Sequence, residues 1–133
     1  MSLTTKDALL EAIAEQAETL ATNLPSALTT NSTTVTVTKN SSAVGNIGSY
    51  QAIRKGGGLV VANFNFNLLA NQATQTVLFT GLPKPMESVE GLISNGSTVV
   101  RVYVNTDGEL KLDGAGPSSA GYVAGQIVYF TEE

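Results

Sequence analysis

The sequence predicts a mainly-β protein, an antiparallel β-sandwich of jelly-roll type preceded by an N-terminal α-helix that forms a short coiled coil. Val100, Val102 and Val104 alternate with polar neighbours, which is the period of a strand with one buried face. Turn signals flank that strand, N-G at 95–96 and D-G at 107–108. About eight such segments recur every 8 to 12 residues or so, a spacing typical of a sandwich or a small barrel.

The N-terminal segment, residues 1–25, is predicted to be a helical stalk. Thr4 can cap the helix with Asp7 three residues later, and Pro25 ends it. Its apolar residues are spaced in alternating steps of three and four, which is a heptad pattern. We expect this seam to join identical chains, although an amphipathic helix packed on its own domain would show the same spacing. The seam residues are Leu10, Ile13, Ala17, Leu20 and Leu24.

Residues 26–46 are predicted to be a polar connector that contains the first strand, at 35–38. Residues 47–133 form the β-body, with further strands at 47–53, 59–69, 76–80, 88–94 and 123–130 besides the hairpin around 107–108. R-K-G-G-G at 54–58 is a tight turn rather than a phosphate loop, because a strand and not a helix follows it. L-P-K-P at 82–85 crosses the rim, since proline cannot donate to a central ladder.

The side-chain patterns of two predicted strands indicate which of their faces are polar and which are apolar. In residues 59–69 the odd positions from Asn63 to Asn67 carry amides, either as polar filler and cross-strand hydrogen bonders or as groups that bind sugar hydroxyls. In residues 123–130, Val128 and Phe130 are apolar on the face opposite Ile127 and Tyr129. A strand apolar on both faces needs cover on both, from its own core or from another subunit.

Composition excludes several classes of function. The formal net charge is −4, without a basic run, so nucleic-acid binding is not expected. The chain has no cysteine and no histidine, so we expect no disulfide, no metal site and no cofactor. No segment has the length of a membrane span and no signal peptide is visible, so we expect synthesis in the cytoplasm without membrane insertion.

Four short motifs, in order, resemble the head domains of trimeric phage receptor-binding and baseplate tip proteins. They are R-K-G-G-G at 54–58 with the following strand, L-P-K-P at 82–85, N-T-D-G-E-L at 105–110, and I-V-Y-F at 127–130. The resemblance covers residues 47–130. It implies a homotrimer with the heptad seam as its stalk, a place at the tail tip or baseplate of a virion, and neighbouring tail proteins as partners.

The resemblance also implies recognition of host cell-wall saccharide or teichoic acid. The chain has neither the tryptophan nor the histidine with which such heads often hold sugar, so stacking on the ring would fall to Tyr50, Tyr103, Tyr122 or Tyr129. The expected ligand-binding residues are Tyr103 and Arg101 on one polar strand face, Tyr122, and Asp113 at the start of a long loop. Each of them could instead be an ordinary surface or interface residue.

Two other functions compete with saccharide recognition. The first is a purely structural trimeric connector of the tail or baseplate that binds no glycan. The second is a glycan depolymerase, which needs two carboxylates about 5 to 10 Å apart. Asp107 and Glu109 lie at a hairpin tip, which offers no cleft, so we expect no enzymatic activity.

Overall fold

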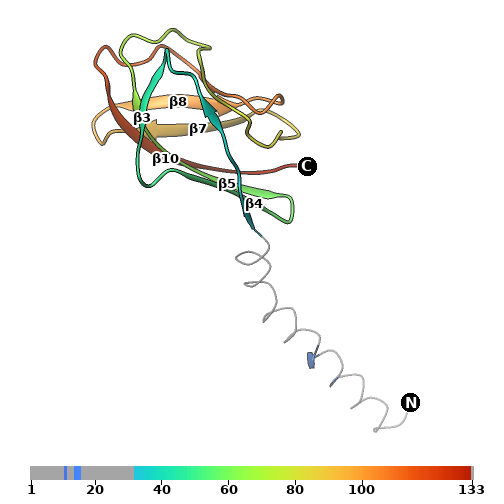
Figure 1. The fold of residues 1–133 in the computed structure, drawn as a ribbon. Helices are drawn as coiled ribbons and strands as arrows, with labels where there is room; N and C mark the ends of the chain where they lie inside the picture. Colours follow the sequence, from blue (N-terminus) through green and yellow to red (C-terminus); the bar gives the residue numbers. More distant parts are fainter. Residues whose placement is uncertain (1–10, 12–13, 16–31, 133) are drawn as a thin grey trace. The chain divides into compact units, whose positions relative to one another are not determined.

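The computed structural model of the chain describes residues 11, 14–15 and 32–132. The chain divides into two compact units, Met1–Ser32 and Thr33–Glu133, and the described fold is that of the second (Figure 1). The predicted stalk therefore stays a prediction. Its seam residues, Leu10, Ile13, Ala17, Leu20 and Leu24, all lie outside the described residues.

Residues 32–132 form ten β-strands that belong to one antiparallel sheet (Figure 1). The prediction of a mainly-β, antiparallel body is confirmed, whereas the finer jelly-roll sandwich stays a prediction. Along the sheet the order is β1-β4-β5-β10-β7-β8-β9-β6-β2, and β3 pairs with β5 outside this path. The strands are β1 (Thr33–Thr34), β2 (Thr38–Lys39), β3 (Val44–Ile47), β4 (Ala52–Gly56), β5 (Leu59–Leu68), β6 (Val77–Thr80), β7 (Val89–Ser94), β8 (Val99–Val104), β9 (Leu110–Leu112) and β10 (Gly121–Phe130).

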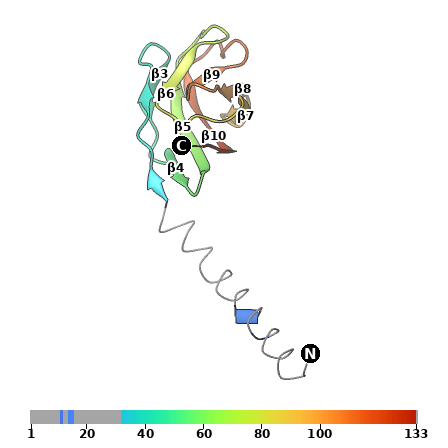
Figure 2. The same cartoon turned by 90° about the vertical axis from the view of Figure 1, so that its right-hand side faces the viewer.

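The sheet is curled, and its two edge strands, β1 and β2, belong to one short stretch of chain, residues 33–40. β1 pairs with β4 at one end of the sheet and β2 pairs with β6 at the other. Backbone hydrogen bonds extend both pairings, from Val35 N to Ile53 O at 2.8 Å and from Asn40 N to Leu78 O at 2.9 Å. The strands therefore surround one interior, and the second view shows them wrapping around it (Figure 2).

The core is made by strand alternation, as predicted. Every second residue of β5 is buried, and three phenylalanine rings meet in the interior. Phe66 of β5 lies edge-on to Phe79 of β6, with ring centroids 5.0 Å apart, and Phe64 lies 5.7 Å from the same ring. Edge-to-face pairs of this kind add to the stabilisation from apolar burial.

Both predicted hairpin turns are confirmed. Gly96 and Gly108 have φ values of 95° and 78°, which residues with a Cβ rarely adopt. Asn105 Oδ1 accepts hydrogen bonds from the backbone of Asp107 and Glu109, which closes the second turn. A Cβ at Gly108 would lie 2.1 Å from the carbonyl oxygen of Leu82, so glycine is required there for space as well as for φ.

The region from 47 to 58 differs from its prediction. The expected strand at 47–53 is interrupted, because β3 ends at Ile47, a turn follows, and β4 begins at Ala52. At this point the Gln51 side chain, through Oε1, accepts the Asn65 backbone N–H at 3.1 Å, and Gly48 N donates to Asn65 O at 2.7 Å. The turn predicted at 54–58 is confined to Gly57 and Gly58, since Arg54 and Lys55 belong to β4.

Candidate functional site

Three of the four predicted ligand-binding residues lie together on the outward side of β8. Arg101 and Tyr103 are two residues apart on this strand, and Asp113 follows β9, which pairs with β8. The Arg101 guanidinium lies 3.3 Å from Asp113 Oδ2 and 3.6 Å from Glu90 Oε2 of β7. The Asp113 backbone N–H also donates to the Arg101 carbonyl at 2.9 Å. We call these residues, with Tyr103, the β8 cluster.

The polar groups of the β8 cluster are engaged by one another or by the neighbouring loop. The Tyr103 hydroxyl donates to Gln75 Oε1, and Gln75 itself has a positive φ of 67°. Because Arg101 already faces two carboxylates, its charge is compensated within the cluster. Exposed ion pairs of this kind contribute about 0–1 kcal/mol to stability. The cluster can offer hydroxyl-binding oxygens, but not an uncompensated cation for a phosphate.

Tyr122, the fourth predicted residue, lies on β10 and not on the β8 strand face. It is half exposed and directly opposite Asn67 of β5. Asn67 Oδ1 is buried and has no hydrogen-bond partner among the described residues, which is the kind of acceptor that an ordered water satisfies. Tyr122 therefore belongs to the outward face that β5 and β10 form together.

The outward face of β5 and β10 changes character along the pairing. At one end the cross-strand pairs are Asn63 with Gln126 and Asn65 with Ala124; at the other end Val128 pairs with Val61. The β5 members of all these pairs face outward, because the residues between them form the buried side. One half of the face is thus polar and the other half apolar.

The polar half contains a shallow hollow of about 480 Å³ beside Tyr50. Tyr50 stands in the turn between β3 and β4 with 83% of its surface exposed. We call this the amide hollow; its lining residues are Tyr50, Asn63, Phe64, Asn65, Ala124, Gly125 and Gln126. The asparagine alternation and Tyr50 are visible in the sequence, but the hollow is not, because Gln126 reaches Asn63 only through the pairing of β10 with β5.

The apolar half is an exposed apolar stripe. Phe130 is paired with Leu59 and is 71% exposed, and Val128 is paired with Val61 and is 49% exposed. Met86, 65% exposed, lines a surface pocket together with Phe130. The predicted two-sided apolarity of the last strand is thus confirmed, with its second face uncovered in the single chain. We call these five residues the apolar stripe.

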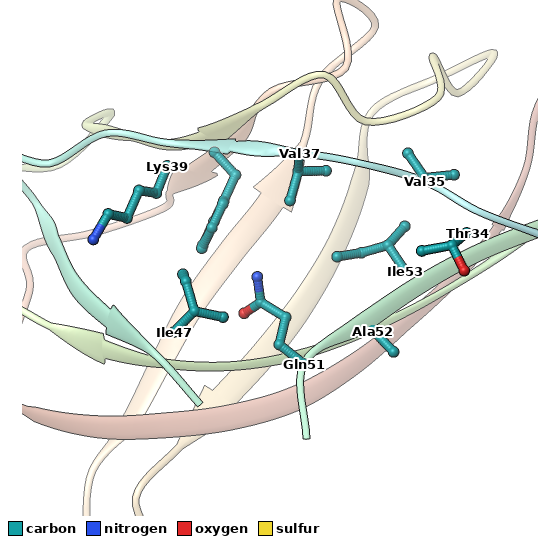
Figure 3. A pocket seen from close by; sticks show the side chains of 9 residues that line it. Thr34, Val35, Val37, Lys39, Ile47, Gln51, Ala52 and Ile53 are labelled. Atoms are coloured by element: carbon teal, nitrogen blue, oxygen red, sulfur yellow. The ribbon is translucent and has the colours of Figure 1, made fainter. Parts of the chain in front are cut away.

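A third concave region lies where the closing stretch 33–40 passes over the sheet. This pocket of about 380 Å³ is lined mainly by apolar side chains, with Val35, Val37 and Ile53 around it and Lys39 at one end (Figure 3). Lys39 Nζ donates to the Gly45 carbonyl at 2.7 Å. Its ammonium group is therefore held by the protein itself.

Among the described residues, no group of three or more acidic, histidine or cysteine side chains is placed to hold a metal ion. Nor does the described part of the chain contain a helix long and apolar enough to cross a membrane. No protein-family model and no curated protein matches the sequence.

Proposed function

We propose that this chain is a non-enzymatic, trimeric head protein of a phage tail tip or baseplate that recognises saccharide or teichoic acid of the host cell wall. The proposal includes the helix over 1–25 as the trimer stalk and a jelly-roll-like body. The apolar stripe supports the trimeric part of this proposal, since it is a surface that one copy leaves uncovered. Contiguous exposed apolar surface of this kind marks an interaction site.

The chemistry around the stripe favours a second copy of the same chain as its cover. Arg54 of β4 lies beside Val61 on one flank, whereas Glu87 lines the pocket at Phe130 on the other. In a cyclic trimer each interface joins two different flanks, so the basic side of one copy can meet the acidic side of the next. The heptad seam would then add a second contact between the same chains, because about three heptads alone are marginal.

A purely structural connector is the second candidate, and the β8 cluster favours it. Arg101 is compensated by two carboxylates and Tyr103 is bonded to Gln75, so the residues predicted to bind sugar interact with the protein itself. In this case the trimer would join or seal parts of the tail without touching the host.

Two measurements on the full-length chain test the proposal. Sedimentation velocity is expected to show about three times the chain mass of 13.8 kDa. Co-sedimentation with purified walls of several Gram-positive hosts is expected to retain the trimer on at least one of them. A trimer that binds none of these walls contradicts saccharide recognition and favours the connector, and a monomer at micromolar concentration contradicts both candidates.

A further inference from the structure

The amide hollow combines an exposed aromatic ring with a fixed row of amides. The Tyr50 ring is the most exposed large apolar side chain among the described residues, although a ring of this size is normally at least half covered. It stands in the turn after β3, beside Asn65 and Asn63 of β5. An exposed ring next to hydrogen-bonding amides is the arrangement that binds the apolar face and the hydroxyl edge of a pyranose.

The pairing of β10 with β5 sets the shape of the hollow. Ala124 is paired with Asn65, and Gly125 follows Ala124 in the lining. Because Ala124 carries only a methyl group, the outward surface is depressed between Tyr122 and Gln126, its neighbours on the same strand face. Gly125 lies on the opposite strand face. A side chain on Gly125 is excluded, since its Cβ would lie 2.3 Å from the Leu92 carbonyl oxygen.

The amides are oriented by the protein and keep free hydrogen-bonding capacity. Gln126 Nε2 donates to Asn63 Oδ1 at 2.9 Å, which fixes both amide planes. Each amide has two donor hydrogens and one acceptor oxygen, so this bond leaves donors on Asn63 and an acceptor on Gln126. The Asn65 side chain packs against Gly48, where an added Cβ would lie 1.6 Å from Oδ1. A ligand would therefore meet a row that needs little ordering on binding.

The lining residues select for an uncharged ligand. None of the seven residues around the hollow carries a formal charge. Phosphate groups are usually held by arginine, lysine or helix N-termini, and the lining provides none of these. We propose that the amide hollow binds a neutral saccharide unit, with Tyr50 stacking on the ring and the amides of Asn63, Asn65 and Gln126 bonding its hydroxyls. This site rests on the proposed function.

The test uses the full-length chain and an array of neutral oligosaccharides of glucose, galactose, rhamnose and N-acetylglucosamine, with polyglycerol phosphate as a charged probe. Titrating the best neutral binder is expected to shift the side-chain amide NMR signals of Asn63, Asn65 and Gln126. The Tyr50→Ala variant is expected to weaken its binding about tenfold. Val99→Ala, which changes an exposed residue at the end of β8, is the matched control and is expected to bind like the wild type.

The outcomes separate this site from the proposed function. If the wild type binds a saccharide that Tyr50→Ala binds equally well, the hollow is not the site, while saccharide recognition stands. If Tyr103→Ala or Tyr122→Ala loses binding while Tyr50→Ala binds like the wild type, the ligand lies at Tyr103 or Tyr122. That result also overturns the hollow as the site. Preference for polyglycerol phosphate contradicts the uncharged selectivity. If the wild type binds no probe, both the site and saccharide recognition fail.

Discussion

Replacing Phe130 with serine is expected to weaken association between copies and to leave each β-body nearly as stable as before. The reason is where this side chain lies. It belongs to the apolar stripe and is 71% exposed in the single chain, so folding covers little of it. Phe66, which is also on the β5–β10 sheet, is fully buried in the same structure.

The size of the effect follows from the uncovered area. A phenylalanine buries about 150–250 Å² when fully covered. With 71% still exposed, an interface could remove about 100–180 Å² from water at Phe130. At about 25 cal/mol per Å² this amounts to at most about 2.5–4.5 kcal/mol, which corresponds to at most roughly 60- to 2,000-fold in the dissociation constant. The burial lost within one chain, about 45–70 Å², is expected to cost about 1–2 kcal/mol of stability.

Sedimentation velocity over a range of concentrations measures the association, and urea unfolding measures the stability of the variant. Val99→Ser serves as the control, because Val99 is 63% exposed but lies outside the stripe. The reasoning is refuted if Phe130→Ser assembles like the wild type. It is also refuted if the stability falls by about 3–5 kcal/mol, as for truncation of a buried phenylalanine, since the stripe would then be part of the core.

Three further predictions follow from single contacts. Gly108→Ala is expected to lower the free energy of unfolding in urea by about 2–4 kcal/mol, because the added Cβ would lie 2.1 Å from the Leu82 carbonyl oxygen. Gly96→Ala, whose Cβ would have no atom near it, is expected to lower it by only about 1 kcal/mol. Equal losses would mean that the positive φ alone accounts for both effects. Tyr129→Phe is expected to lose about 1 kcal/mol by the same assay, because it removes the buried hydroxyl that donates to the Pro83 carbonyl at 2.7 Å, and no change would show that this bond contributes nothing net. Arg101→Leu is expected to change stability by about 1 kcal/mol or less and to leave wall binding intact; a loss of wall binding would place the ligand at the β8 cluster.

Features that depend on neighbours along the chain could be predicted from the sequence. The valines of β8 and the alternation in β5 define which face is buried, because successive strand residues point to opposite sides. The positive φ of Gly96 and Gly108 could be predicted from turn chemistry alone. The interruption between β3 and β4 could not, because it depends on Gln51 bonding the backbone of Asn65 across the sheet.

The candidate sites, too, have features that the sequence predicts and features that only the tertiary structure shows. From the sequence one learns that Arg101 and Tyr103 share a strand face, that Asn63 and Asn65 share another, and that Val128 and Phe130 need a cover. The tertiary structure alone decides that Arg101 is held by Glu90 and Asp113, and that Gln126 comes to Asn63, sixty-three residues away in the chain. The physical reason is that side-chain direction within a strand is set by local backbone geometry, whereas the neighbour across the ladder is set by register over long loops. What a surface of this protein can bind therefore depends on the pairing and register of its strands.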